Sequence, residues 1–256
     1  MHPTPPLTAL ADLPVQLHSA GWAVVDAPTL ATLCKLPQLA LQAWLPHWPE
    51  LPPDPHLRDG GHYRKRRHGC FRVSAGGVSA VARRPHWQPV EYNALHGGFE
   101  RWFDPLPPAL VADPAWAQLL QGLARVADGL RGPGGSGAEW FVEAHPFRID
   151  TEGAGGIGRP TPEGAHRDGV DLVAVFLVGR RGVKGGETRV FEAQGPSGLR
   201  FTLTEPWSLM LLDDARMIHE STPIQPLGDA EHGARDTLVI TCRGQGFQGD
   251  EGKKSG

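Results

Sequence analysis

The sequence predicts an α+β, mainly β protein in which a helix-rich first half supports a jelly-roll or barrel formed by the second half. Between residues 139 and 243, short apolar runs alternate with Gly and Pro, which is the pattern of successive short strands. Before residue 139, apolar residues recur at helical spacing. The 33 Gly and 25 Pro cluster locally without a repeat, so they indicate turns and loops.

Two segments of the first half have helical periodicity. Leucines recur at positions 30, 33, 36, 39 and 41, which predicts a helix within residues 30–44. Asp113-Pro114, an N-cap followed by Pro at the first helical position, predicts a second helix that continues to Leu130. Because such helices can bury their apolar stripes only against a sheet, we predict one domain. Residues 1–138 form its support and lid, and residues 139–243 form the jelly-roll core. The polar, Gly-rich residues 244–256 form a disordered tail.

The second half is read as strands throughout. Asp171 to Val178 is almost entirely apolar and rich in β-branched residues, which predicts a strand covered on both faces. Gly185-Gly186 predicts a hairpin into the strand 187–191, and a Glu-Pro turn predicts pairing of 199–204 with 207–212. Residues 139–150 and 235–243 form the first and last long strands. In the last strand, alternation places Arg235, Thr237, Val239 and Thr241 on one face.

Composition excludes several classes of protein. A net charge of −3 gives no electrostatic case for nucleic acid or an anionic membrane. No run reaches eighteen apolar residues, and the N-terminus lacks the pattern of a signal peptide. Three scattered cysteines indicate reduced thiols, so we expect a cytoplasmic protein. A small-molecule substrate is the expected partner, and a homodimer is left open.

One short motif carries most of the functional signal. His166-x-Asp168 stands at the entrance of the apolar strand 171–178, after a Pro-rich approach. In an extended segment, residues i and i+2 point to the same side, so an imidazole and a carboxylate can hold one metal ion together. With 12 His in the chain, about one such triplet is expected by chance, and a loop histidine beside a turn aspartate is the simple alternative.

Two downstream residues extend this motif to a larger set of candidate site residues. His219 lies in a short strand-like stretch, and Arg235 opens the terminal strand. Two His and one carboxylate form the facial triad of non-haem Fe(II) oxygenases. An Arg on a later strand can bind a dicarboxylate in a bidentate pair. Two His and one Asp also suit zinc, but Arg235 would then have no role.

The order of these residues resembles that of the Fe(II)/2-oxoglutarate-dependent dioxygenases. The stretch 162–169, Pro-Glu-Gly-Ala-His-Arg-Asp-Gly, and the later Gly185-Gly186-Glu187 resemble the branch that contains bacterial L-isoleucine 4-hydroxylase and the biofilm/stress/motility proteins. The resemblance is densest over residues 139–243 and continues more weakly through 92–106.

The resemblance implies a fold, a set of cofactors and roles for residues. The fold would be a double-stranded β-helix backed by N-terminal helices. His166, Asp168 and His219 would hold Fe(II), while 2-oxoglutarate and O₂ are consumed. Arg235 would bind the remote carboxylate of 2-oxoglutarate, and Thr237 would add a hydroxyl donor. The reaction would hydroxylate an unactivated C–H bond of a small carboxylate-bearing substrate, with a free aliphatic L-amino acid expected first. The alternative is a non-catalytic metal-binding relative with a stress or biofilm role.

The substrate residues are predicted from charge and position. A basic run at 64–67 is either a solvated edge strand or a source of one Arg that reaches the site. A small zwitterion needs a buried cation for its carboxylate. The candidate substrate residues are Arg66, Arg148, Tyr63 and Asn93.

Overall fold

The structure, a computed structural model, describes residues 4–37, 39–132, 139–151, 156–228 and 232–250. Its helices are the 3₁₀ turns η1 (Leu10–Asp12) and η2 (Leu45–His47) and the α-helices α1 (Leu13–Ala20), α2 (Ala27–Cys34), α3 (Ala40–Trp44), α4 (Pro108–Val111) and α5 (Pro114–Arg131). Its strands before residue 151 are β1 (Trp22–Val25), β2 (Arg64–Arg66), β3 (Gly69–Ser74), β4 (Gly77–Ala80) and β5 (Trp140–Asp150). Those that follow are β6 (Leu172–Arg181), β7 (Val183–Gly185), β8 (Thr188–Glu192), β9 (Gly198–Phe201), β10 (Leu209–Asp213), β11 (Met217–Ser221), β12 (Ile224–Pro226) and β13 (Ala234–Arg243).

A large antiparallel sheet forms the centre of the molecule. Its strand order is β1-β10-β6-β13-β5-β3-β4, and β2 pairs with the upper part of β5. The two longest neighbours, β5 and β13, are in register from Ala234 opposite Asp150 to Arg243 opposite Phe141. The protein is therefore mainly β with antiparallel sheets and a few helices, as the sequence predicted.

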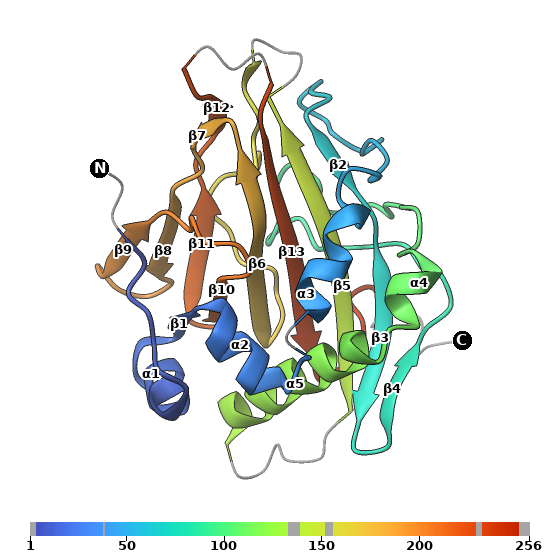
Figure 1. Ribbon diagram of the computed structural model, residues 1–256, viewed down its shortest axis with the longest axis vertical. Coiled ribbons are helices and arrows are strands. Elements are labelled where there is room, and N and C mark those ends of the chain that lie inside the picture. Colours follow the sequence, from blue (N-terminus) through green and yellow to red (C-terminus); the bar gives the residue numbers. More distant parts are fainter. Residues whose placement is uncertain (1–3, 38, 133–138, 152–155, 229–231, 251–256) are drawn as a thin grey trace.

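Helices cover one face of this sheet (Figure 1). Helix α5 begins where predicted, because the Asp113 side chain accepts the N–H of Ala115 and Pro114 occupies the first turn. Four tryptophans join the helical layer to the sheet through edge-on contacts: Trp44, Trp48, Trp116 and Trp207. The indole N–H of Trp48 also donates to the carbonyl of Thr237 on β13, at 3.0 Å. The helical layer thus fixes the strand on which two predicted site residues lie.

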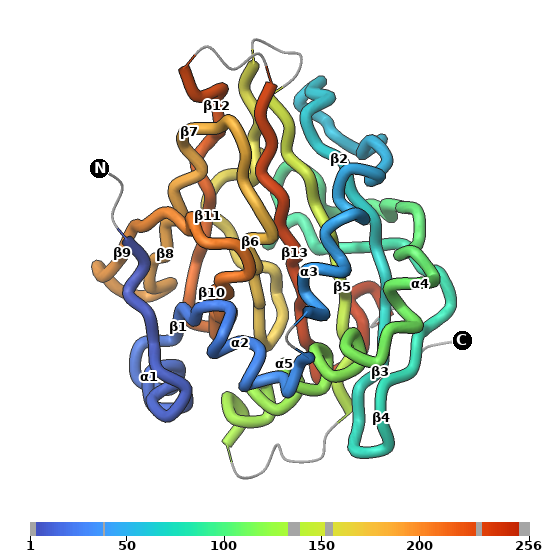
Figure 2. Tube along the Cα trace, viewed as in Figure 1, coloured from blue at the N-terminus to red at the C-terminus, as the bar shows by residue number. Residues whose placement is uncertain are grey.

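Smaller sheets cover part of the other face. One is three-stranded with the order β11-β8-β9, and the other pairs β7 with β12, as the tube in Figure 2 traces. Strand β6 is buried on both sides, as predicted. Leu172, Ala174 and Phe176 join the core beneath the helices, whereas Val173, Val175 and Leu177 join a second core toward β8 and β9. Because of this alternation, the predicted site residues on the neighbouring strand β13 lie on the face of the large sheet away from the helices.

Local predictions were wrong in three places. The segment 30–44 is two helices instead of one, because α2 ends at Cys34, its C-cap Lys35 is left-handed (φ 55°), and Pro37 follows. Gly185 and Gly186 do not close a hairpin, since β7 pairs with β12 and β8 pairs with β11 and β9. The segments 198–201 and 209–213 do not pair with each other either, because β10 lies between β1 and β6.

The predicted disordered tail needs correction over residues 244–250. Phe247 is 3% exposed and packs edge-on against Phe141, with ring centroids 5.1 Å apart. Gln248 is also buried and is tied to the backbone of the His-x-Asp segment. An aromatic anchor and a hydrogen-bonding amide therefore hold this stretch in place, and residues 251–256 lie outside the described part of the chain. None of the helices in the described residues is both long and apolar enough to cross a membrane.

Candidate functional site

The structure brings His166, Asp168 and His219 together. A pair of backbone hydrogen bonds joins the two histidines: the N–H of His166 donates to the carbonyl of His219 at 3.1 Å, and the reverse bond is 2.9 Å. Their rings consequently lie side by side, with centroids 4.6 Å apart. Asp168 approaches both imidazoles, with its carboxylate oxygens 3.8 Å from Nε2 of His166 and 4.0 Å from Nε2 of His219. These separations are too long for hydrogen bonds but suit three donors that share one ion.

The loop that carries Asp168 is held by Asp214. The Asp214 carboxylate accepts the backbone N–H groups of Asp168, Gly169 and Val170 at 3.0, 2.7 and 3.0 Å. Burial, followed by the charge of Asp168, raises the pKa of Asp214 to about 7. Gly169 has φ +77°, and a Cβ there would lie 2.5 Å from the ring of Tyr92, so this turn requires glycine.

Side chains from two further segments fix Asp168 itself. The amide of Gln88 donates to Oδ1 of Asp168 at 3.0 Å, and its own oxygen accepts from Asn93 and Arg101 at 3.1 and 2.8 Å. The amide of Gln248 donates to the carbonyls of Asp168 and Gly169 at 2.8 and 3.0 Å. Gln88 therefore orients the carboxylate, and Gln248 holds the backbone that carries it.

The two histidines have opposite electrostatic environments. Burial, together with neighbouring His166, holds the pKa of His219 well below its usual value, so this imidazole is neutral. Burial also lowers the pKa of His166, but the carboxylates of Asp168 and Glu163 outweigh this effect and raise it. Oε1 of Glu163 lies 3.6 Å from Nε2 of His166, while its Oε2 is buried without a hydrogen-bond partner among the described residues. This concentration of negative charge favours a cation between the side chains.

Arg235 and Thr237 line the same cavity from β13. Arg235 is 3% exposed, and its Nε has no hydrogen-bond partner in the described part of the chain. Burial and the neighbouring Arg180 lower the pKa of Arg235 to about 10, so it is still a cation at neutral pH. Arg235 forms no ion pair with a carboxylate of the described residues, so its buried guanidinium is suited to receive an anionic ligand. The face predicted for the last strand is confirmed, since Val239 and Thr241 also line the cavity.

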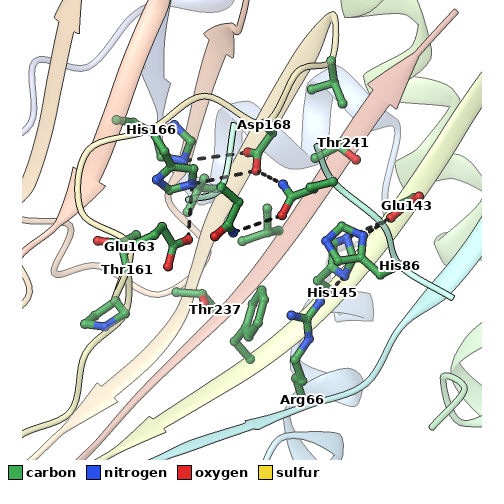
Figure 3. Close-up of a pocket in the computed structure, with 18 of the residues that line it drawn as sticks. Arg66, His86, Glu143, His145, Thr161, Glu163, His166, Asp168, Thr237 and Thr241 are labelled. Atoms are coloured by element: carbon green, nitrogen blue, oxygen red, sulfur yellow. Dashed lines mark hydrogen bonds and ion pairs between the residues drawn. The ribbon is translucent and has the colours of Figure 1, made fainter. Parts of the chain in front are cut away.

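The substrate candidates divide into two groups. Arg66 and Asn93 line the cavity, and Figure 3 shows Arg66 on the side away from His166 and Asp168. Arg148 forms a bidentate pair with Asp236, at 2.8 and 2.7 Å, and is not among the cavity-lining residues. Tyr63 is buried and donates its hydroxyl to Asp59, also away from the lining.

Several lining residues were missed at the sequence level: Gln88, Arg101, Glu143, His145, Glu163 and Gln248. Strand alternation could have found two of them. On β5, Phe141, Glu143 and His145 face the cavity, while Trp140, Val142 and Ala144 face the helices. The same alternation assigns Arg148 to the side away from the cavity. Gln88, Arg101 and Gln248 lie in irregular segments that have no such periodic signal.

Comparison with known proteins places this geometry in context. The family description "2OG-Fe dioxygenase" matches residues 45–241 of the chain. The chain belongs to the 2OG-Fe dioxygenase family. A solved bsmA homolog from Methylobium petroleophilum PM1 is 53% identical to this dioxygenase, covers 97% of this chain and 98% of its own, and superposes with a TM-score of 0.88.

Two more distant structures share the fold of this dioxygenase. IDO from Bacillus thuringiensis is 14% identical, with 93% of this chain and 97% of that one covered and a TM-score of 0.72. The Fe(II)/α-ketoglutarate-dependent dioxygenase TqaL is 19% identical, with 94% and 89% covered and a TM-score of 0.67. No curated protein matches the chain.

Family membership makes the protein an oxidoreductase that uses Fe(II), 2-oxoglutarate and O₂. The donor set around Asp168 fits this metal, because two imidazole nitrogens and one carboxylate leave further coordination positions for the co-substrates. When bound, the iron supplies the oxidative chemistry, and the protein supplies geometry, charge and exclusion of water.

Proposed function

We propose that this dioxygenase hydroxylates a small carboxylate-bearing molecule, with a free aliphatic L-amino acid as the first expectation, on a closed jelly-roll scaffold of a single domain. The observation that carries the proposal is a single cavity lined by His166, Asp168 and His219 and by the buried Arg235 and Arg101, neither of which forms an ion pair with a carboxylate of the described residues. In this proposal the three residues hold Fe(II). Arg235 binds the remote carboxylate of 2-oxoglutarate, and the hydroxyl of Thr237 donates to it.

A second cation supports a substrate that carries a carboxylate. Arg101 lines the cavity, is 2% exposed, and forms no ion pair with a carboxylate of the described residues. Its Nη2 donates to Gln88, while its Nε has no partner in that part of the chain. Arg66 is buried similarly and stacks on Phe103 at 3.9 Å and Phe147 at 4.4 Å. We therefore assign the substrate carboxylate to Arg101, with Arg66 beside it.

The cavity wall also offers a carboxylate, Glu163, for the ammonium group of a zwitterion. Oε2 of Glu163 is buried in the cavity wall and accepts no hydrogen bond from the described residues. An ammonium group placed there would both donate to it and balance its charge, which a fatty acid would not do. Phe141, Val175 and Met210 add apolar surface to the same cavity. Cations, an unsatisfied carboxylate and an apolar wall together match an aliphatic amino acid.

The experiment that tests this proposal measures succinate formation with Fe(II), 2-oxoglutarate and O₂ across the free L-amino acids. An accepted amino acid is then compared with its methyl ester, which removes the carboxylate charge with little change of shape. We expect kcat/KM for the ester to fall by more than about tenfold, as the loss of one charge-assisted hydrogen bond implies. Equal values for acid and ester would exclude recognition of the carboxylate. Arg101→Met should reproduce the ester's defect, and Arg148→Met, which removes a buried Arg outside the cavity, is the matched control.

A further inference from the structure

A second group of potential metal ligands lies across the cavity from His166 and Asp168. It consists of His68, His86, Glu143 and His145, which we call the His/Glu cluster, and all four side chains are buried. Figure 3 shows His86, His145 and Glu143 together on the opposite side of the pocket from Asp168. One donor atom from each residue lies within 4.8 Å of the others. The cluster joins three segments of the chain: the link between β2 and β3, the loop after β4, and β5.

The donor atoms converge on one oxygen. Oε2 of Glu143 lies 2.6 Å from Nδ1 of His86, 3.1 Å from Nε2 of His68 and 3.5 Å from Nε2 of His145. The rings of His68 and His145 are stacked, with centroids 4.8 Å apart and planes 5° apart. His86 crosses His145 at 4.7 Å and 67°. Three imidazole nitrogens and one carboxylate oxygen within reach of one another are donors that zinc accepts.

A contact with Arg66 limits how His145 can bind a metal. Its Nη2 lies 2.7 Å from Nδ1 of His145. Because a guanidinium only donates, Nδ1 accepts and the proton of this ring is on Nε2, which faces Glu143. His145 can therefore bind a metal through Nε2 only when Arg66 turns away and the proton moves to Nδ1. The nitrogens of His68 and His86 that face Glu143 hydrogen-bond to it at 3.1 and 2.6 Å, so each ring must carry its proton on the far nitrogen when it binds a metal. Nε2 of His68 also lies 3.3 Å from Sγ of Cys70.

We propose that the His/Glu cluster is a second metal site that binds Zn²⁺ through His68, His86 and Glu143, with His145 as a fourth ligand in competition with Arg66. The proposed hydroxylation does not depend on this site. A bound ion would fasten the link between β2 and β3 and the loop after β4 to the strand that forms one wall of the cavity. Its loss would therefore change thermal stability as well as metal content.

The test is a count of the zinc bound after the protein has been stripped with a chelator, reloaded with Zn²⁺ and freed of excess metal. We expect the wild-type chain to retain two equivalents of Zn²⁺, one at each site, because the first site also offers donors that suit zinc. His219→Ala should retain one equivalent, and Glu143→Gln in that background should retain none. Glu143→Gln removes the anionic ligand, so affinity at the second site should fall by more than about 100-fold. His96→Gln, which changes another fully buried histidine, is the matched control and should retain both equivalents.

Two results would overturn the proposal. One is a wild-type chain whose zinc binding is abolished by His219→Ala alone. The other is one equivalent of zinc that persists in the variant with both His219→Ala and Glu143→Gln. His68→Gln, at a residue outside the cavity lining, repeats the test if Glu143→Gln does not fold by circular dichroism. Arg66→Met should tighten zinc binding, since it frees Nδ1 of His145, and an unchanged affinity would remove His145 from the ligand set.

Discussion

Replacing Arg235 with Met separates the binding of 2-oxoglutarate from the stability of the fold, because the two effects have opposite signs. The Arg235 side chain is 3% exposed, and its Nε finds no hydrogen-bond partner among the described residues. An unsatisfied buried donor costs about 1–3 kcal/mol, so Met, which has a similar length and no charge, should raise the free energy of unfolding of the ligand-free protein by roughly that amount.

Binding of the co-substrate should fall in the same variant. Truncating one partner of a buried charged pair costs roughly 2–5 kcal/mol, which is an increase of about 30- to 4,000-fold in the Kd for 2-oxoglutarate. At a concentration of 100 times the Kd, a ligand stabilises the native state by about 2.7 kcal/mol. The wild-type protein should therefore gain about 2.7 kcal/mol when 2-oxoglutarate is added at this concentration, and Arg235→Met should gain less than about 1 kcal/mol.

The assay is urea unfolding of the iron-loaded protein under anaerobic conditions, with and without 2-oxoglutarate, together with calorimetric titration of the ligand. Arg148→Met is the control, because it removes a buried Arg that is paired with Asp236 and lies outside the cavity lining. It should lower the free energy of unfolding and leave the Kd for 2-oxoglutarate unchanged. A Kd that does not change in Arg235→Met would refute the role of Arg235, whatever happened to stability.

Three further predictions concern the support of the site and the effect of pH. Asp214→Asn places an amide against backbone N–H groups that now donate to a carboxylate, so the Kd for Fe(II) should rise by about 10- to 100-fold, as an equilibrium titration would measure. Phe247→Ala should lower the free energy of unfolding by about 3 kcal/mol, and an unchanged urea midpoint would show that residues 244–250 do not pack on the sheet. Burial lowers the pKa of His96 to about 4, below the value of about 6.5 in the unfolded chain. Between these values the unfolded state binds the extra proton, so stability should fall by about 1.4 kcal/mol for each pH unit of acidification, and His96→Gln should remove this part of the slope.

Local sequence patterns predicted the strands that bear the site residues and the helix α5. They did not predict which strands pair with each other. The strands that became β5, β6, β11 and β13 follow from short apolar runs and alternation, and helix α5 follows from Asp113-Pro114. Strand β10 shows the limit. It lies next to β9 in sequence but pairs with β1 and β6, because its alternate residues fill both cores. Nothing in the local sequence distinguishes that choice from a hairpin.

The site was predicted to the extent that its residues lie in regular strands or in a short motif. His166, Asp168 and His219 converge because one backbone bridge aligns segments that are far apart in the chain. Arg235 and Thr237 follow from the alternation of the last strand. Gln88, Arg101 and Gln248 approach from loops and from the C-terminal stretch, where the path of the chain depends on tertiary contacts. Arg148 shows the reverse case. Its charge made it a candidate substrate residue, but its position in the strand directs its side chain to Asp236, away from the cavity.

The alternation along β5 and β13 has a consequence for how this enzyme can diversify. On both strands, one set of residues packs under the helices and the other lines the cavity. A substitution at Thr241 or Phe141 alters the shape offered to a substrate without removing volume from the helical core, whereas a substitution at Ile240 or Val142 does the opposite. The wall of the cavity and the core under the helices are therefore set by different residues of the same strands. Thr241 can change without touching either core, whereas Phe141 also supports Phe247 and is tied to stability.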